Sequence, residues 1–243
     1  MPISPNQGST GGGFPATLTG TGLTGATMVH FGNKTATITA TSPTSVSVVA
    51  PSGAGVVDTT VTTPGGISSP VPFFYVPPPA VLDISPSSGP VAGGSTVTVT
   101  GRGLATAGSV LFGGTAVTPT VLSDSELTAV SPAHATGEVS LIVTARGGTA
   151  TASETFAFVP APDVTGFSPL TGLPAGGTLV DITGTALATT TGVAFGGVPA
   201  TFAVLSDTRV AAVAPSHALG AVTITLTTTG GSDAAPGVFL YTL

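Results

Sequence analysis

The sequence predicts an all-β protein made of three antiparallel β-sandwich domains in tandem. Three observations support this: motifs recur about every 80 residues, apolar residues alternate with Ser or Thr, and Gly- and Pro-rich turns separate short runs. The chain has 35 Gly and 22 Pro in 243 residues, and no apolar run reaches the ~18 residues that a membrane helix needs. We therefore expect a turn-rich chain that does not insert into a membrane.

The repeat is visible as five motif columns with a common spacing. Corresponding residues are 81 positions apart between the first and second units, and 83 apart between the second and third. The columns are Ile3-Ser4-Pro5, Ile84-Ser85-Pro86 and Phe167-Ser168-Pro169; Gly12-Gly13, Gly93-Gly94 and Gly176-Gly177; Gly22-Leu23, Gly103-Leu104 and Ala186-Leu187; Phe31-Gly32, Phe112-Gly113 and Phe195-Gly196; and Ala50-Pro51, Ser131-Pro132 and Ala214-Pro215. Five columns that share one spacing indicate three copies of one structural unit.

Each unit closes with a Gly-Gly turn followed by an aromatic strand. The turns are Gly65-Gly66, Gly147-Gly148 and Gly230-Gly231, and the strands are Phe73 to Val76, Phe156 to Val159 and Phe239 to Tyr241. Short Pro-rich segments follow the first two strands, so we place the domains at residues 1–77, 78–160 and 161–243. Pro-rich linkers are extended and semi-rigid, which predicts a rod of three domains.

Within a unit, about seven short runs alternate between apolar and polar residues. Thr96 to Thr100, Val139 to Val143 and Val222 to Leu226 show the period of two that is typical of strands with one buried face. β-branched Thr suits the outer face of such a strand as well as Val suits the inner one. The pattern predicts an antiparallel sandwich of roughly 80 residues per unit.

The order of motifs in a unit resembles the IPT/TIG family of immunoglobulin-like domains. That order is [Ile/Phe]-Ser-Pro, Gly-Gly, Gly-x-[Gly/Ala]-Leu, Val-x-Phe-Gly, [Ala/Ser]-Pro and a final Gly-Gly before the aromatic strand, and it covers essentially all 243 residues. The resemblance implies an immunoglobulin-like sandwich in each unit and a role like that of bacterial stalks, adhesins or particle-surface appendages. The first unit departs most, with Thr59 and Thr60 where the second has Leu141 and Ile142, which predicts a weaker core.

Charge and cysteine content exclude several classes of function. The chain has ten acidic residues and only four basic ones, and the basic residues are scattered along the sequence: Lys34, Arg102, Arg146 and Arg209. A nucleic-acid backbone needs clustered cations, so nucleic acid is not an expected partner, and nothing matches the basic loops of the DNA-binding branch of the family. Without Cys, neither disulfides nor thiolate metal sites can form.

No group of residues predicts catalysis, cofactor binding or metal binding. We interpret the glycines of Gly20-Thr21-Gly22 and Gly101-Arg102-Gly103 as turn residues, since neither motif supplies a third Gly or opens a helix. His30 falls in a strand, and His134 and His217 occupy one column in different domains, so no zinc site is expected. Calcium needs more carboxylates than Asp83 and Asp163 provide, one at each junction.

Two further motifs are interpreted as turns. Asp124 and Asp207 share a Ser-Asp column in which a short carboxylate can cap backbone N–H groups. Asn33-Lys34-Thr35 fits the pattern of an N-glycosylation acceptor, but it follows the Val-x-Phe-Gly motif and is better explained as a hairpin turn.

Outer strand faces of Thr, Ser, Ala and Gly with few charges favour packing against another protein. One hypothesis, slightly preferred, is a non-enzymatic structural or decoration protein on a larger particle such as a phage capsid or tail. The other is an exported bacterial cell-surface adhesin, or a stalk or accessory module of a secreted enzyme, with glycan binding left open although the chain has no Trp and two Tyr. Met1 to Pro5 show no secretory signal as given. The location stays open, with the virion surface favoured by the first hypothesis and the extracellular space or cell surface by the second. The candidate contact loops are Gly8 to Gly13 and Ser232 to Gly237, at the expected free ends.

Overall fold

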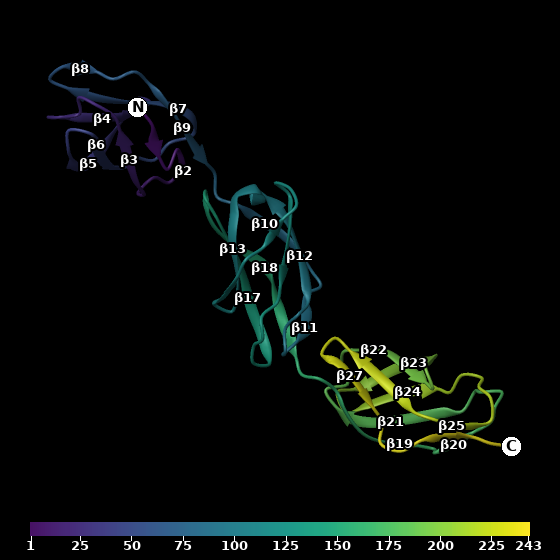
Figure 1. Cartoon of the computed structure of the whole chain (residues 1–243). Coiled ribbons are helices and arrows are strands. Elements are labelled where there is room, and N and C mark those ends of the chain that lie inside the picture. Colours follow the sequence, from purple (N-terminus) through teal and green to yellow (C-terminus); the bar gives the residue numbers. More distant parts are fainter. The chain divides into compact units, whose positions relative to one another are not determined.

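A computed structural model describes residues 1–243 as three sets of β-strands, with one 3-10 helix in the second set (Figure 1). The strands of one set do not pair with those of another. Each set is an antiparallel sandwich with apolar side chains between its layers, as the sequence predicts.

The first domain joins its two layers through one long strand. Its order is β1-β3-β6-β5-β4-β7-β9-β2, with β8 paired to β7. The first half of β5 pairs with β4 and the second half with β6, so β5 crosses between the layers. The strands are β1 (Ile3–Ser4), β2 (Gln7–Ser9), β3 (Pro15–Thr19), β4 (Met28–Phe31), β5 (Lys34–Thr41), β6 (Ser45–Val49), β7 (Gly55–Thr63), β8 (Gly66–Ile67) and β9 (Val71–Val76).

The second domain has the same layers as two separate sheets, β10-β12-β16-β15 and β11-β18-β17-β13-β14. The crossing strand is broken here because Pro119 cannot donate a ladder hydrogen bond, and β14 and β15 lie on either side of it. The elements are β10 (Ala80–Ser85), β11 (Ser88–Pro90), β12 (Thr96–Arg102), a 3-10 helix (Leu104–Thr106), β13 (Ala107–Phe112), β14 (Thr115–Val117), β15 (Thr120–Val121), β16 (Glu126–Val130), β17 (Gly137–Ala145) and β18 (Gly148–Val159).

The third domain repeats the crossing, with β23 paired first to β22 and then to β24. Its sheets run β19-β21-β24-β23-β22-β26-β27 and β20-β28-β25. The strands are β19 (Asp163–Ser168), β20 (Thr171–Gly172), β21 (Leu179–Thr185), β22 (Thr190–Phe195), β23 (Val198–Ser206), β24 (Arg209–Val213), β25 (Gly220–Val222), β26 (Ile224–Thr228), β27 (Gly231–Ala234) and β28 (Phe239–Tyr241).

Nine or ten strands per domain exceed the expected seven or so, mainly because the opening strand is divided at the Ser-Pro motif. Before the motif, β1 pairs antiparallel with β3; after it, β2 pairs parallel with the closing strand β9 in the other layer. The second and third domains show the same parallel pairing between β11 and β18 and between β20 and β28. The opening segment therefore contributes to both layers and ties each domain's start to its end.

The cores contain the residues that the alternation places inward. Phe73 in the first domain and Phe239 in the third are fully buried, and each stands edge-on to the Phe of the Val-x-Phe-Gly motif, with ring centroids 5.1 and 5.2 Å apart. In the second domain Phe112, Phe156 and Phe158 are likewise buried. Aromatic pairs in this geometry stabilise a core by more than the burial of their apolar area alone. The closing strand therefore anchors each core.

Candidate functional site

The outer face of one sheet in the third domain exposes a group of apolar side chains. Along β21, Val180 and Ile182 point into the core, while Leu179 points outward with 63% of its surface exposed. Leu179 lies opposite Val213 of β24, and Val213 lies opposite Thr201 of β23. Inward residues are buried by the other layer, so the outward residues of the three strands form one continuous face.

The next row of this face combines one carboxylate with two small apolar side chains. Asp181 lies opposite Ala211, which lies opposite Ala203. The apolar part forms a shallow hollow of ≈240 Å³ lined by Leu179, Thr201, Phe202, Ala203, Ala211 and Val213. We call these six residues the β21–β24–β23 face. Leu205, 56% exposed, lies further along β23.

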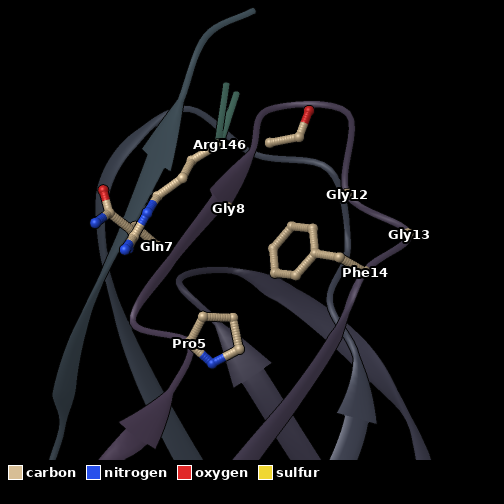
Figure 2. Close-up of a pocket in the computed structure, with 8 residues that line it drawn as sticks. Pro5, Gln7, Gly8, Gly12, Gly13, Phe14 and Arg146 are labelled. Atoms are coloured by element: carbon tan, nitrogen blue, oxygen red, sulfur yellow. The ribbon is translucent and has the colours of Figure 1, made fainter. Parts of the chain in front are cut away.

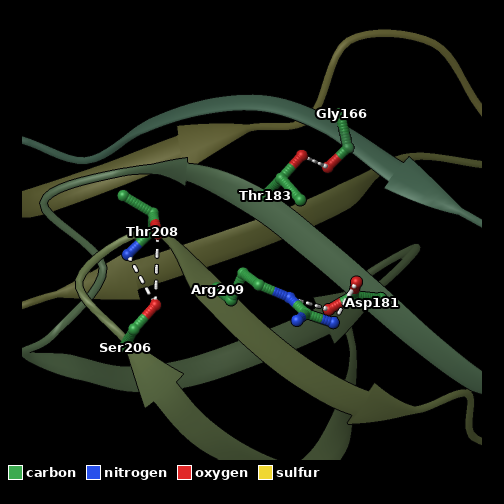
Figure 3. Close-up of polar contacts among 6 residues, drawn as sticks. All are labelled: Gly166, Asp181, Thr183, Ser206, Thr208 and Arg209. Atoms are coloured by element: carbon green, nitrogen blue, oxygen red, sulfur yellow. Dashed lines mark hydrogen bonds and ion pairs between the residues drawn. The ribbon is translucent and has the colours of Figure 1, made fainter.

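One ion pair borders the apolar part (Figure 3). Arg209 Nη2 donates to Asp181 Oδ2 at 2.7 Å and Nε donates to Oδ1 at 3.2 Å, so the contact is bidentate. The hydrogen bond from Asp181, with its negative charge, raises the pKa of the Arg209 guanidinium. Nearby, the Thr183 hydroxyl donates to the carbonyl of Gly166 at 3.3 Å. The guanidinium and carboxylate satisfy one another, which leaves the adjoining face nearly uncharged.

The equivalent faces of the other domains are more polar. The difference lies at the position of Leu179, which corresponds to Pro15 in the first domain and Thr96 in the second, whereas Val130, the equivalent of Val213 in the second domain, is exposed as well. In the first domain Thr17 lies opposite Ser47, and their hydroxyl oxygens are 3.3 Å apart in a hydrogen bond. A hydroxyl-covered face is well hydrated, whereas the face of the third domain gains free energy when another surface covers it.

The structure places the three histidines apart from one another. His30 lies half-buried on β4, whereas His134 stacks on Phe158 with ring centroids 4.8 Å apart and His217 stacks on Tyr241 at 5.0 Å. No three His, Asp or Glu side chains lie near enough to one another to hold a metal ion. His134 and His217 thus each pack an imidazole ring on an aromatic residue of the closing strand. The sequence did not reveal this packing role.

The two Ser-Asp turns are capping sites, as predicted. Asp124 accepts hydrogen bonds from the backbone N–H groups of Gly103 at 3.2 Å and Ala105 at 3.4 Å, which holds the 3-10 helix. Asp207 accepts one from Ala188 at 3.3 Å. These carboxylates therefore stabilise the turns that the Ser-Asp column predicts.

Of the predicted turn glycines, Gly22 and Gly103 are confirmed, whereas Gly101 belongs to strand β12, where the Ala80 carbonyl approaches its backbone too closely for a Cβ. Gly22 and Gly103 have φ of 71° and 69°, in the left-handed region that favours glycine. Asn33 lies in the turn between β4 and β5, where Phe31 pairs with Lys34, so the hairpin interpretation is also confirmed.

The junction acids show no common site. Asp83 lies on β10 and Asp163 begins β19, and both are exposed. Sequence reasoning missed Asp233 instead, whose carboxylate accepts a 2.8 Å hydrogen bond from the Val164 backbone N–H and joins β27 to β19. An acid within a Ser/Thr-rich hairpin gives no local signal of a partner 69 residues away.

Both candidate contact loops are only partly loops, because each predicted segment begins within a strand. Gln7–Ser9 is strand β2, which pairs with β9 so that Ser9 lies opposite Val76, at the end of the domain from which the chain leaves. Gly231–Ala234 is strand β27, paired with β26. Backbone pairing thus makes Gly8, Ser9 and Ser232 to Ala234 part of the sheets, while residues 10–13 and 235–237 remain turns or irregular segments, as predicted.

A hollow does lie beside the first of these segments (Figure 2). Its lining in the first domain includes Pro5, Gln7, Gly8, Gly12 and Phe14. The Phe14 ring stacks on the buried Phe73 with centroids 5.6 Å apart. Gly8 faces the Phe14 ring, whereas the Gln7 side chain lies on the opposite face of β2 and points away from the ring in Figure 2.

No helix of the structure is long and apolar enough to span a bilayer.

The comparisons with known proteins give one family and several similar solved structures. The family model described as IPT/TIG domain matches three times, at residues 1–75, 79–158 and 162–241. Among solved structures, the extracellular region of Plexin A4 is similar over 97% of this chain at 16% identity and a TM-score of 0.46, and the chain covers 33% of that protein. The SGBP-B protein of a Bacteroides ovatus mixed-linkage glucan utilization locus, in complex with a mixed-linkage heptasaccharide, is similar over 94% of this chain and 60% of its own at 16% identity and a TM-score of 0.33.

The chain therefore spans about a third of the plexin and about three fifths of the glycan-binding protein. No curated protein matches the sequence.

Proposed function

Since the chain belongs to the IPT/TIG domain family through all three of its repeats, we propose that it is a non-enzymatic structural protein that binds other proteins of a larger assembly. In this proposal the assembly is a particle such as a phage capsid or tail, which the chain decorates. Short Pro-rich linkers support a semi-rigid rod, which spaces a contact surface from an attachment point.

The observation that supports this function best is the β21–β24–β23 face. Leu179 and Val213 lie side by side on an outer face whose ion pair is already satisfied. Exposed apolar surface of this kind, bordered by polar groups, marks protein interaction sites in soluble proteins. The equivalent positions Pro15 and Thr96 offer less, so the third domain is the one that we assign to the contact.

The test is binding of the full chain to particles purified from the source culture. We expect the native chain to co-sediment with particles, and Leu179→Glu to reduce its affinity about tenfold or more by introducing an unpaired charge at the contact. Thr96→Glu is the matched control, since it alters the equivalent exposed position of the second domain. Equal binding of both variants would contradict the assignment of the contact to the third domain. A native chain that does not bind particles but binds cells would contradict the proposal that the assembly is a particle.

The alternative is an exported cell-surface adhesin, or a stalk or accessory module, that binds glycans. It is favoured by the hollow in Figure 2, which is lined by the apolar ring of Phe14 and, from the other face of β2, by Gln7, whose amide can hydrogen-bond a hydroxyl-rich ligand. A glycan array probed with the full chain tests it. Binding that Gln7→Ala removes and Leu179→Glu preserves would support this alternative over the first function.

A further inference from the structure

One column of the repeat holds a histidine in two domains and a glycine in the first. His134 packs its ring on Phe158, with ring centroids 4.8 Å apart, and His217 packs on Tyr241 at 5.0 Å. The equivalent residue of the first domain is Gly53. The first domain therefore lacks the flat ring that packs on the closing strand in the other two domains.

The space of this ring is open in the first domain. In the third domain, a Cβ added to Gly196 would lie 3.1 Å from His217 Nε2 and 2.9 Å from Val222. In the first domain, a Cβ added to the equivalent Gly32 would meet only Val57 within 4 Å, apart from its own chain neighbours. Val57 is the equivalent of Val222, so the difference between the two domains is the missing imidazole.

A hollow of ≈420 Å³ lies in this space. Its volume is toward the lower end of small-ligand pockets, which cover about 300–1,000 Å³. Phe31 and Tyr75, both buried, form its apolar floor together with the half-buried Val57. Gly53 narrows it, because its backbone lies so close to the Tyr75 ring that an added Cβ would collide. The hollow therefore suits a molecule with one small ring.

The lining carries one charged side chain, and its charge is positive. Lys34 stands at the rim, where the second and third domains have Thr115 and Val198. Its Nζ donates to the carbonyl oxygen of Ser52 at 2.9 Å and to Ser52 Oγ at 3.1 Å, which holds the ammonium group beside the hollow. An ammonium group has three N–H donors, so the third is available to a ligand.

No carboxylate in the lining balances the ammonium group. Asp58 is the only acid of the first domain, and alternation along β7 turns it to the opposite side of the strand from Val57. Asn33 also lines the hollow, where the other domains have Gly114 and Gly197, and its amide adds a further donor and acceptor. The domain that lacks the imidazole thus carries polar groups that select an anion.

We propose that this hollow binds a small aromatic carboxylate. The ring lies between Tyr75 and Gly32, in the space that the imidazole of His217 fills in the third domain. The carboxylate accepts a hydrogen bond from Lys34 Nζ, and such charge-assisted bonds are about twice as strong as neutral ones. A flat ring has few rotatable bonds, so little conformational freedom is lost on binding. The site goes beyond the protein contact that we propose for the third domain.

The probe is benzoate, added to the ¹⁵N-labelled full chain. We expect saturable shifts of the backbone amide signals of Gly32, Lys34 and Gly53. The amides of Gly196 and His217 should stay in place, because the imidazole already fills the equivalent space. Benzamide has the same shape without the charge and should bind about tenfold more weakly or worse. Acetate, which has the charge without the ring, should also bind more weakly than benzoate.

Free aromatic acids and peptides that end in Phe share this chemistry. N-acetyl-glycyl-phenylalanine, with a free carboxylate, is therefore titrated beside benzoate. Tighter binding of the peptide would identify a carboxyl-terminal aromatic residue as the ligand, and tighter binding of benzoate would identify a free acid. Both results support an aromatic carboxylate site.

Lys34→Thr provides the decisive variant. Thr115 is native at the equivalent position of the second domain, where it pairs with Phe112 across the hairpin, so the variant should fold like the native chain. We expect the affinity for benzoate to fall about tenfold or more and the affinity for benzamide to stay the same, because only the charge is lost. Arg102→Thr is the matched control, since it removes an exposed cation of the second domain and should leave benzoate binding unchanged.

Three results would overturn the inference. The first is an absence of saturable shifts at high millimolar benzoate, and the second is equal affinity of Lys34→Thr and the native chain for benzoate. The third is a pattern of shifts spread evenly over all three domains. Leu179→Glu and Gln7→Ala should not alter benzoate binding, which separates this site from the contact of the third domain and from the hollow in Figure 2.

Discussion

The Tyr75 hydroxyl donates a 2.7 Å hydrogen bond to the carbonyl oxygen of Pro51, and this joins the closing strand of the first domain to the loop after its Ala-Pro motif. Tyr241 makes the same bond to Pro215 at 2.8 Å in the third domain. The second domain has Phe158 in this position and packs His134 on its ring. One position of the repeat thus combines a core ring with a polar tip in two domains out of three.

Both tyrosines should ionise only at high pH. Burial raises the pKa of Tyr75 and Tyr241 above the ordinary value of 10.0. The unfolded chain releases these protons near that value, so the stabilisation that they provide is complete below about pH 10 and is lost as the pH rises through the folded pKa. The chain has no Trp, so absorbance at 295 nm follows these two groups alone. A native titration midpoint at or below 10.0 would contradict the prediction.

Replacing Tyr75 by Phe should destabilise the first domain at neutral pH by about 1 kcal/mol, since the Pro51 carbonyl loses its partner. The same replacement should remove the alkaline loss of stability in that domain. Urea unfolding, followed by circular dichroism at pH 8 and pH 11, measures the difference in stability. Hydrogen exchange of the first domain is added at the pH where exchange is slow enough to measure. Phe158, native in the second domain, shows that the fold accepts Phe here.

Thr59→Val should stabilise the first domain. The Thr59 side chain is fully buried and its hydroxyl has no hydrogen-bond partner, whereas the equivalent residues are Leu141 and Ile224. Val has nearly the same shape without the unsatisfied oxygen, so we expect a gain of about 1 kcal/mol in the free energy of unfolding. In a Tyr241→Phe background, the fluorescence of Tyr75 reports on this domain alone.

The matched control is Thr228→Val in the third domain. Thr228 is also buried, but its hydroxyl accepts a hydrogen bond from the Gly230 N–H at 3.1 Å and donates to the Gly231 carbonyl at 3.3 Å. The same substitution should therefore cost about 1–2 kcal/mol there. Equal effects at the two positions would refute the role assigned to the unsatisfied hydroxyl.

Ala186→Gly should stabilise the third domain. Ala186 has φ of 56° in the left-handed region, where the first and second domains have Gly22 and Gly103. A Cβ costs about 1–2 kcal/mol in this conformation, and Gly removes that cost. Gly is also more flexible in the unfolded chain, which offsets part of the gain and leaves a net stabilisation of about 0.5–1 kcal/mol. Tyr241 fluorescence in a Tyr75→Phe background measures it. Ala203→Gly, on an exposed strand face, should instead destabilise.

Asp124→Ala should loosen the 3-10 helix of the second domain. The Gly103 and Ala105 N–H groups would lose their acceptor, at a cost of about 0.5–2 kcal/mol. Hydrogen exchange measured by mass spectrometry should show faster exchange in peptides that cover residues 98–112 and unchanged exchange in the other two domains. Asp124→Asn keeps one acceptor oxygen and should lose less.

Much of the fold could be predicted from the sequence because it depends on local patterns. The alternation around Val97 and Val99 predicts which face of the strand points into the core. Gly103 predicts a left-handed backbone conformation in the turn that follows. The Ser-Asp column predicts caps in the second and third domains, since the carboxylate of Asp124 or Asp207 bonds a turn that the sheet brings close to it. Repetition made each of these signals visible in at least two copies.

The candidate sites depended on contacts between distant segments. The sequence shows Leu179 as an outward residue, but only the pairing of β21, β24 and β23 brings it beside Val213 and Ala211. The division of the opening strand at Ser-Pro moved Gly8 from an expected free-end loop into a strand beside Tyr75.

The glycine repeat makes the same distinction. The sequence by itself determined that Gly65, Gly147 and Gly230 occupy one position in three copies of one domain, because motif spacing is a property of the chain alone. Only the tertiary structure decided that Gly147 and Gly230 are covered by a linker carbonyl while Gly65 is exposed. A side chain's surroundings are set by segments far away in sequence, and these differ even where the local sequence is repeated.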